Sequence, residues 1–262
     1  MKIRSLYTVF LVFLTANTAA AFDTSEQGLY AQMLRTYTHS VDDLAGTRVD
    51  YAGLAGDPRW RQTVQSLEAT PASERKTREQ QLAFWINAYN IFAIDMVVQN
   101  LPLKSIRNIG NLFWPVWKRP AGSVDGTPVT LDGIENQTLR PMGDPRIHAA
   151  IVCASLSCPS LRRTPYTPDA IEDELDASAR NWLANSNKGM AIERKQDQLR
   201  ISKIFDWFEE DFGAVGGVRA FLARYAPPGD QGWLQKQGRS ARIGYFDYDW
   251  ALNSVATAPG SQ

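Results

Sequence analysis

Residues 77–100 constrain the fold more than any other part of the chain, because they are charged at the start and then almost continuously apolar. A helix that is apolar on all sides is buried on all sides, so this pattern predicts the central helix of a globular core. Leu101-Pro102 ends the pattern. The strand-like segments elsewhere are few, short and scattered. We therefore expect an α+β fold, formed as a single domain around this helix.

Hydrophobic spacing, capping residues and turn residues predict the remaining elements. The helices expected on these grounds cover residues 24–44, 58–67, 130–139, 168–185, 204–212 and 218–225. The extended or strand-like segments expected cover residues 47–54, 147–152, 198–201 and 241–245. A turn-rich section lies between them, with strand-like residues around a turn at Val124-Asp125-Gly126.

The first 21 residues have the layout of a secretory signal peptide: a basic start, a short apolar run and then Ala19-Ala20-Ala21. The apolar run is too short to span a bilayer, so we expect cleavage near Ala21 and no stable membrane insertion of the mature chain. The protein is then exported, to the periplasm or the medium. We expect residues 22–74 to form an N-terminal helical extension, 75–255 the main domain and 256–262 a disordered tail.

The charge balance and the cysteine count exclude several classes of protein. The chain has 28 basic and 28 acidic residues, so it offers no broad positive field to a nucleic acid. Two cysteines are too few for a disulfide framework or a four-thiolate zinc site. Their spacing with one histidine is not a standard zinc spacing either. We expect no nucleic-acid partner, no metal and no cofactor.

Two amides, Asn87 and Asn90, interrupt the apolar helix and share one face of it, because they are three residues apart. A buried amide without a partner costs about 1–3 kcal/mol, so each must meet a specific group. Two interpretations remain open. The amides pin neighbouring loops through backbone groups, or one of them orients a catalytic side chain or supports an oxyanion.

The segment from Asp144 to Pro159 holds both cysteines, Cys153 and Cys158, and one of the two histidines, His148. Three interpretations compete for the cysteines: a disulfide, a thiolate nucleophile activated by His148, or small buried side chains. On a regular strand Cys153 would face away from His148, because side chains alternate between the two faces. A direct pair therefore requires the chain to bend after Val152.

Several motifs, in the same order along the chain, resemble those of the DUF547 family. They are Phe84–Asn90, Ser105–Arg107, Leu131–Asn136, Asp144–His148, Cys153–Pro159, Phe205–Phe208, Asp211-Phe212 and Tyr248–Asn253. The resemblance covers about residues 75–255, with a departure at Ala251, where the family often has serine. The family is named for having no assigned function. Its motifs emphasise the block that holds His148 and the cysteines, and the two helix amides.

Two functions from different classes follow. The first is a thiol-dependent hydrolase or acyltransferase that acts on peptide-like or cell-envelope amides. Cys153 or Cys158 would be the nucleophile and His148 the general base. Asn87 would orient groups or support an oxyanion, and Asp249 is a candidate third member.

The second is a non-catalytic binding or interaction module, stabilised by a Cys153–Cys158 disulfide, that holds an unknown ligand or an envelope protein. Its aromatic-rich surface would include Trp114, Trp117 and Trp250. The candidate binding residues are Asn90, Arg146, Ser155 and Trp250.

Overall fold

The structure is a computed structural model that describes residues 22–25 and 27–257. The expected signal peptide at 1–21 and residues 258–262 of the expected tail lie outside the described residues. Ala256 and Thr257, which were also assigned to the tail, belong to a 3-10 turn at Val255–Thr257.

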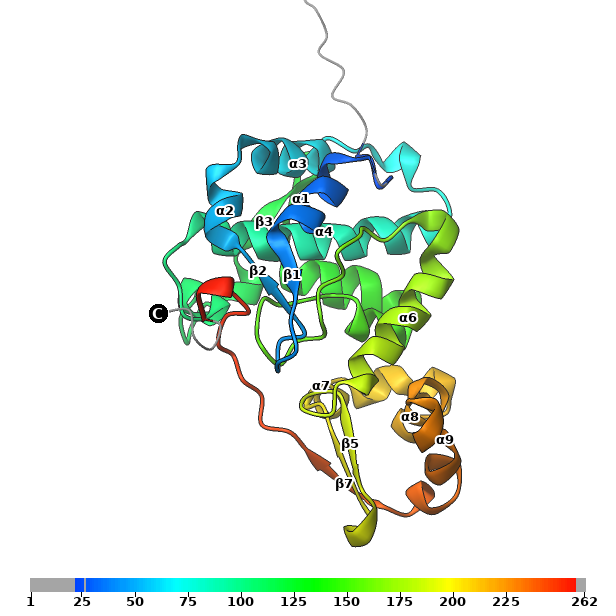
Figure 1. Cartoon of the computed structure of the whole chain (residues 1–262). Coiled ribbons are helices and arrows are strands. Elements are labelled where there is room, and N and C mark those ends of the chain that lie inside the picture. The colour runs from blue at the N-terminus through cyan, green and yellow to red at the C-terminus, as the bar shows by residue number, and fades with distance from the viewer. Residues whose placement is uncertain (1–21, 26, 258–262) are drawn as a thin grey trace, which may run out of the picture.

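Short helices predominate and the strands form three small sheets (Figure 1). The helices are α1 (Leu29–Tyr37), α2 (Tyr51–Gly56), α3 (Pro58–Glu68), α4 (Arg78–Gln99), α5 (Leu131–Gly133), α6 (Ile171–Ala184), α7 (Ile204–Trp207), α8 (Val218–Tyr225) and α9 (Pro228–Gln235). The strands are β1 (Thr38–Ser40), β2 (Thr47–Val49), β3 (Pro120–Val124), β4 (Thr127–Thr130), β5 (Met190–Glu193), β6 (Gln198–Ile201) and β7 (Arg242–Tyr245). The expected α+β class is confirmed.

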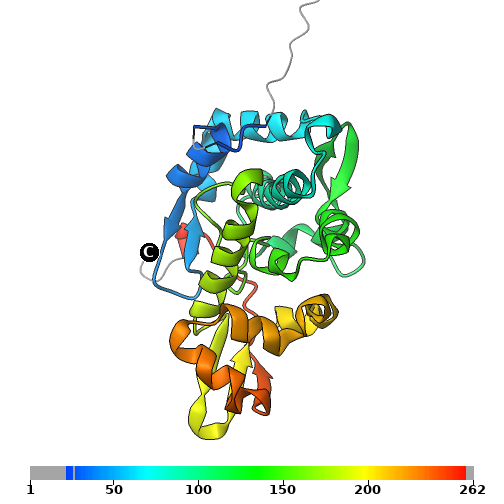
Figure 2. The ribbon, with the colours of Figure 1, turned by 90° about the vertical axis from the view of Figure 1, so that its right-hand side faces the viewer.

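Helix α4 is the central helix, and its expected position is confirmed to within one residue at each end. Thr77 caps its first turn in a capping box with Gln80, which satisfies two backbone N–H groups that the helix leaves free. From Leu82 to Val97 nearly every residue is buried. Figure 2 shows α4 end-on, enclosed by other elements. By length and composition alone α4 could cross a membrane. It is, however, mostly buried inside the protein, as expected for the core helix of a globular fold.

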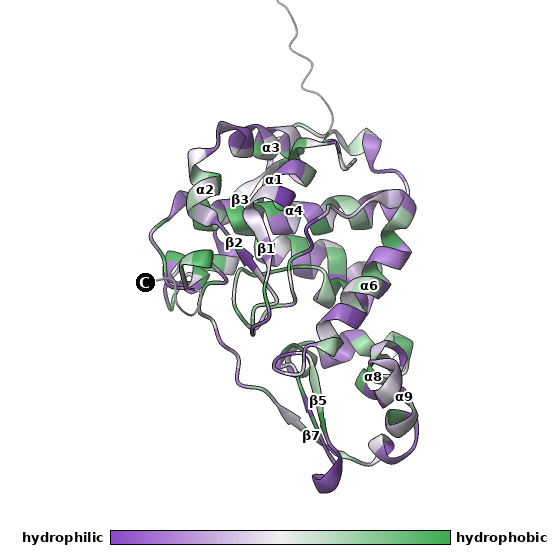
Figure 3. Cartoon of the chain, in the orientation of Figure 1, coloured by the Kyte–Doolittle hydropathy of each residue, from purple (hydrophilic) through white to green (hydrophobic). Residues whose placement is uncertain are grey.

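The buried apolar side chains form two core clusters. The first surrounds α4 and includes side chains of α1, α2 and α3, and the outer residues of α3 are largely hydrophilic (Figure 3). The second lies in the lower part of Figure 1, among β5, β6, α7 and α8. Helix α6 belongs to both, because Leu175 packs in the first cluster and Trp182 in the second. This helix therefore joins the two parts of the molecule.

The three sheets are small. β1 and β2 are antiparallel, as are β3 and β4, whereas β6 pairs antiparallel with β5 and parallel with β7. The expected turn at residues 124–126 connects β3 to β4. Its central residues, Asp125 and Gly126, both have positive φ, which matches the right-handed twist of a tight hairpin.

Several expected elements are found close to their predicted positions. The segments at 58–67, 168–185, 198–201, 218–225 and 241–245 correspond to α3, α6, β6, α8 and β7. The helix expected at 130–139 is also present, with Thr130 as its N-cap. After α5 it continues as a π-helix over Ile134–Leu139.

The N-terminal prediction is wrong in part. The helix expected at 24–44 ends at Tyr37, because residues 38–40 form β1 and pair with β2. The extended segment expected at 47–54 is extended only as far as β2. The Asp50 side chain then accepts a hydrogen bond from the Gly53 N–H and starts α2. The expected helical extension at 22–74 thus also contains a two-stranded sheet.

The strand expected at 147–152 is wrong. Residues Pro145–Ala149 form a 3-10 helix, which Asp144 caps by accepting a hydrogen bond from the Arg146 N–H. A capping aspartate followed by proline favours a helical start, and this local signal outweighs the β-branched residues that follow. The alternation of faces that we expected between His148 and Cys153 therefore does not apply. The helix expected at 204–212 is divided into α7 and a 3-10 helix at Glu209–Val215.

The two amides of α4 pin neighbouring segments. Asn87 donates to the Tyr166 carbonyl at 2.8 Å and accepts from the Tyr166 N–H at 3.0 Å. Asn90 donates to the Ala150 carbonyl at 3.0 Å and accepts from the Val152 N–H at 2.8 Å. Each amide therefore uses both of its polar atoms on backbone groups, as in the first of the two interpretations above.

Replacing Asn90 by alanine tests this role. Asn90→Ala leaves a buried carbonyl and a buried N–H without partners, so we expect the free energy of unfolding to fall by about 2–3 kcal/mol. The measurement is chemical denaturation, with exposed Asn187→Ala as the matched control, for which we expect a change within about 0.5 kcal/mol. Equal effects of the two substitutions would contradict the pinning role.

Candidate functional site

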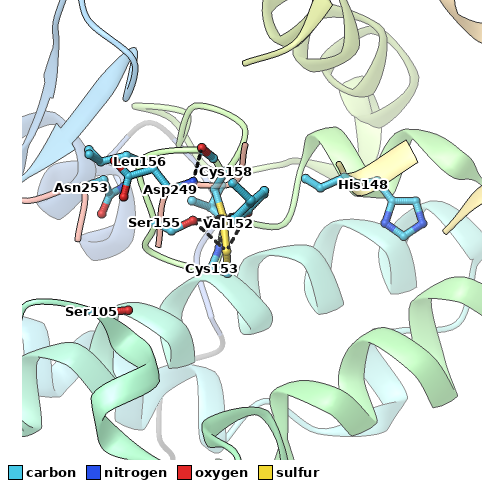
Figure 4. The surroundings of a disulfide bond; sticks show 12 residues. Ser105, His148, Val152, Cys153, Ser155, Leu156, Cys158, Asp249 and Asn253 are labelled. Atoms are coloured by element: carbon cyan, nitrogen blue, oxygen red, sulfur yellow. Dashed lines mark hydrogen bonds between the residues drawn. A yellow bond between two sulfur atoms is a disulfide. The ribbon is translucent and has the colours of Figure 1, made fainter. Parts of the chain in front are cut away.

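The two cysteines, Cys153 and Cys158, form a disulfide with an S–S distance of 2.09 Å (Figure 4). Of the three interpretations of these cysteines, the structure therefore agrees with the disulfide. The sulfurs lie among hydroxyl groups. The Tyr248 hydroxyl is 3.2 Å from the Cys158 sulfur and 3.4 Å from the Cys153 sulfur, and the Ser155 hydroxyl is 3.3 Å from the Cys158 sulfur. Ser155 is thereby a buried neighbour of the disulfide.

The disulfide loop is held from two sides. The returning C-terminal segment binds it through backbone hydrogen bonds, from the Leu156 N–H to the Ala251 carbonyl and from the Asn253 N–H to the Ala154 carbonyl. On the other side the buried Lys188 ammonium donates to the Cys158 carbonyl at 2.6 Å. Burial lowers the pKa of Lys188 to about 7.

A pocket of about 320 Å³ lies beside the disulfide, between the two core clusters. Both cysteines line it. The other lining residues are Tyr89, Trp117, Asp132, Glu135, Asn136, His148, Ile151, Pro159, Ile204, Trp207, Phe208, Tyr248 and Trp250. The lining combines large apolar surfaces with a few polar groups, which is typical of ligand-binding sites.

Four of these residues, Trp117, Trp207, Tyr248 and Trp250, form an aromatic cluster. The Tyr248 and Trp250 ring centroids are 4.5 Å apart, those of Trp207 and Tyr248 4.8 Å, and those of Trp117 and Trp250 5.8 Å. The cluster is not closed off from solvent, because Trp207 is 43% exposed. It therefore presents flat apolar surfaces to the pocket.

Glu135 is the carboxyl group whose environment is most unusual in the pocket. It lies on the π-helix that follows α5, and π-helical turns are frequent at functional sites. Burial raises its pKa to about 7, and the nearby charges of Asp132 and Asp211 act in the same direction, while Arg140 opposes them. The Tyr89 hydroxyl is 3.5 Å from its Oε2. Glu135 therefore keeps its proton in part near neutral pH.

His148 is buried next to Glu135. Its Nε2 is 2.7 Å from Asp211 Oδ2, and its Nδ1 is 4.0 Å from Glu135 Oε1. Burial lowers the pKa of His148, although the bond to Asp211 opposes this shift. The neutral ring donates the Nε2 proton to the Asp211 carboxylate, so Nδ1 is an acceptor that faces Glu135. The His148 ring also stacks on the Phe208 ring, with 4.4 Å between the ring centroids.

Arg140 completes the array. Its Nε and Nη2 bind the two Asp211 oxygens at 2.6 and 2.8 Å. Burial alone would raise the pKa of Asp211, but the hydrogen bonds from His148 and Arg140 lower it well below its usual range. Asp211 is therefore ionised, and the groups follow one another in the order Arg140, Asp211, His148 and Glu135. The ion pair of Arg140 and Asp211 thus fixes the His148 ring, whose other side faces the Glu135 carboxyl.

Some of the residues predicted from the sequence meet in this pocket: His148, both cysteines and Trp250 all line it. The His148 ring, however, points away from the disulfide and toward the other side of the site (Figure 4). Its hydrogen-bond partner is Asp211. The chain does bend after Val152, since Ala154 has φ +60°, but His148 bonds to Asp211 and Cys153 to Cys158, so the bend does not form the direct pair that it was required for.

The other predicted residues lie outside the pocket lining. Asn87 and Asn90 bind backbone groups, as described above. Arg146 forms ion pairs with Asp144, Glu172 and Asp176. Asp249 is exposed and accepts a hydrogen bond from the Ala251 N–H. Among residues 22–25 and 27–257, no group of three or more His, Cys, Asp or Glu side chains is arranged to hold a metal ion.

Sequence reasoning did not single out Glu135, Asp211 or Tyr89. All three lie within motif blocks that carry the family resemblance, Tyr89 in Phe84–Asn90, Glu135 in Leu131–Asn136 and Asp211 in Asp211-Phe212. These motif blocks were the signal in the sequence from which the three residues could have been found. Tyr89 lies between the two helix amides, in a run of mostly apolar residues from which its hydroxyl does not stand out.

The comparison with family models agrees with the motifs. Residues 73–183 match the model described as "Protein of unknown function, DUF547". The chain contains a DUF547 domain. The matched part of the chain includes Glu135, His148 and both cysteines, whereas Asp211 and most of the aromatic cluster follow it. No curated protein and no solved structure gave a significant match.

The raised pKa of Glu135 has a consequence for stability. Between pH 4.5 and pH 7 the unfolded chain has released this proton and the folded protein has kept it, so the free energy of unfolding decreases as the pH rises through this window. Glu135→Gln mimics the protonated form. We expect it to raise the free energy of unfolding at pH 8 by up to about 3 kcal/mol, and by almost nothing near pH 4.

Denaturation of both proteins at the two pH values measures this difference, with exposed Glu74→Gln as the control. A stability difference that is the same at pH 4 and pH 8 would show that Glu135 titrates as an ordinary solvent-exposed carboxyl.

The disulfide also makes a direct prediction. Both cysteines of the chain are bonded to each other, so we expect no thiol to react with a chromogenic thiol reagent, in the native or in the denatured protein. After reduction of the denatured chain, both thiols should react. A fast-reacting thiol in the native, non-reduced protein would contradict the structure of this loop.

Proposed function

We propose that the pocket is the active site of a hydrolase that does not use a thiol, and that Glu135 is its general acid. The observation that carries this proposal is the burial of Glu135, which raises its pKa to about 7, in a pocket whose remaining surface is largely aromatic. A carboxyl that keeps its proton near neutral pH can donate it to a leaving group. Strongly shifted pKa values in pockets are frequent at catalytic sites.

The neighbouring groups have roles that fit this chemistry. His148 is a positioning residue, because its Nδ1 faces Glu135 and its Nε2 is held by Asp211. The second carboxyl in the pocket is Asp132, which accepts a hydrogen bond from Asn136 at 3.0 Å. Asp132 is the candidate base for the attacking water.

The proposed step balances as follows. The oxygen of a water molecule forms a bond to the electrophilic carbon, and the bond from that carbon to the leaving group breaks. Glu135 gives its proton to the leaving group, and Asp132 takes one proton from the water. Transfer of that proton through solvent to Glu135 restores the starting state, so the net reaction is hydrolysis.

The lining indicates the class of ligand. The aromatic cluster offers flat apolar surfaces, while Asp132, Glu135 and Asn136 offer hydrogen-bonding groups at one side. A ligand that fits has an apolar face and several polar substituents. Amino-sugar glycans with acetamido groups have both, and they carry amide and glycosidic bonds, either of which a general acid can help to cleave.

The disulfide bears on the two functions expected from the sequence. A thiol-dependent hydrolase needs a free thiolate, and both sulfurs are bonded to each other. The non-catalytic binding module is the second candidate, and the aromatic cluster beside the disulfide supports it. The two candidates share a ligand class and differ in turnover.

The test uses the β-1,4-linked tetramer of N-acetylglucosamine. Binding is followed by quenching of tryptophan fluorescence, because three tryptophans line the pocket. Turnover is followed by mass spectrometry, which separates chain cleavage from loss of an acetyl group. We expect Glu135→Gln to bind within a few-fold of wild type and to lose turnover by about 100-fold or more. Glu74→Gln is the control and should keep wild-type turnover.

The pH dependence of turnover is an independent test of the role of Glu135. Because the protonated form of Glu135 is the active one, turnover should fall as the pH rises through about 7. Binding without turnover in the wild type at every pH would favour the binding module. Turnover that appears only after reduction, or that survives Glu135→Gln, would overturn the proposal.

A further inference from the structure

Three large apolar side chains project from one loop of the protein. Phe113 is 95% exposed, Leu112 91% and Trp114 50%, the highest values for large hydrophobic residues in the described part of the chain. The loop connects two 3-10 helices, Ile106–Ile109 and Val116–Lys118. Isolated exposed apolar residues need no explanation, but three in a row at a loop tip do.

The loop is built to hold these side chains outward. The Asn111 side-chain oxygen accepts hydrogen bonds from the Phe113 N–H at 3.0 Å and the Trp114 N–H at 2.8 Å. The Asn111 N–H in turn donates to the Trp114 carbonyl. At Gly110 a Cβ atom would lie 2.3 Å from the Val116 nitrogen, so the close turn requires glycine.

These hydrogen bonds matter for the surroundings that the tip can enter. A backbone N–H without a partner is costly in an apolar medium. At this tip the N–H groups of Phe113 and Trp114 are satisfied within the loop. The Trp114 indole also donates, to the Lys118 carbonyl at 3.1 Å. These three donors can therefore leave water without losing a hydrogen bond.

The charge around the tip has one sign. From residue 96 to residue 124 the sequence has no acidic residue and has four basic ones, Lys104, Arg107, Lys118 and Arg119. The first three of these are exposed. Basic side chains beside exposed apolar ones are the combination that binds the surface of a membrane with anionic lipids.

We infer that the Leu112–Trp114 loop docks on an anionic lipid surface, with Leu112 and Phe113 in the interface and the exposed Lys104, Arg107 and Lys118 at the headgroups. A stable protein partner is the less favoured occupant, because three side chains offer much less area than a standard protein–protein interface. The site is also next to the pocket: Trp117 and Trp250 line both the pocket and the groove beside Leu112. Docking would place the pocket entrance near the membrane.

Co-sedimentation with vesicles tests the inference. The full chain is mixed with vesicles of phosphatidylcholine alone or with one-third phosphatidylglycerol. We expect binding to the anionic vesicles, weakened by added salt, and at least a ten-fold loss of affinity in Leu112→Asn/Phe113→Asn. Lys118→Gln, which removes one exposed basic residue, should also weaken binding to the anionic vesicles. The controls are Val215→Asn, which removes an exposed apolar residue elsewhere, and Lys195→Gln, which removes an exposed basic residue elsewhere. Circular dichroism verifies that each variant is folded.

A second readout reports on the loop itself, so that membrane binding by the loop is separated from any binding by residues 1–21. Brominated lipid should quench tryptophan fluorescence in the wild type and less so in Trp114→Phe. Equal binding of wild type and the double variant, together with equal quenching in Trp114→Phe, would overturn the inference. Self-association that the double variant abolishes, without vesicle binding, would also overturn it and assign the loop to protein contact.

Discussion

The hydrogen bond between His148 and Asp211 is the interaction on which the rest of the site depends. It joins residues 63 positions apart, with a distance of 2.7 Å between Nε2 and Oδ2. His148 lies on the 3-10 helix Pro145–Ala149, which packs against α6, and Asp211 lies in the part of the chain that forms the second core cluster. The bond therefore connects the two parts of the molecule across the buried side of the pocket. Arg140 supplies the charge that keeps Asp211 ionised.

This arrangement assigns different states to neighbouring groups. Asp211 is ionised because two donors bind it, and His148 is neutral because it is buried. Glu135 is the third group, and burial without a cationic partner in direct contact leaves it protonated in part near pH 7. Pairs of titratable groups whose environments separate their pKa values are a recurring basis of acid–base catalysis. The disulfide has a different role, as a fixed side of the same pocket.

The sequence was sufficient for the features that depend on local pattern. A 22-residue helix with apolar residues on every side has one plausible environment, so α4 could be located to within a residue. The order of the motifs was likewise enough to recognise the family. The turn at residues 145–149 was missed because its β-branched neighbours favour a strand, while Asp144 and Pro145 start a helical turn.

The composition of the site depends on long-range contacts that spacing cannot reveal. The amides of α4 were expected to meet polar partners, but only the fold shows that these are backbone groups of Tyr166, Ala150 and Val152. Glu135 lies on a π-helix, whose register no periodicity of apolar residues predicts. Asp211 reaches His148 from a separate core cluster. Of the residues predicted from the sequence, His148, Trp250 and both cysteines line the pocket, whereas its carboxyl groups, Asp132 and Glu135, were not predicted.

The central claim is that Glu135 shares the pocket with a neutral His148 and keeps its proton near neutral pH. The most direct measurement is a titration of its side-chain carboxyl carbon by NMR, in protein labelled with ¹³C-glutamate and assigned through Glu135→Gln. The account predicts a midpoint near pH 7. A midpoint close to the ordinary value of 4.5 would contradict it.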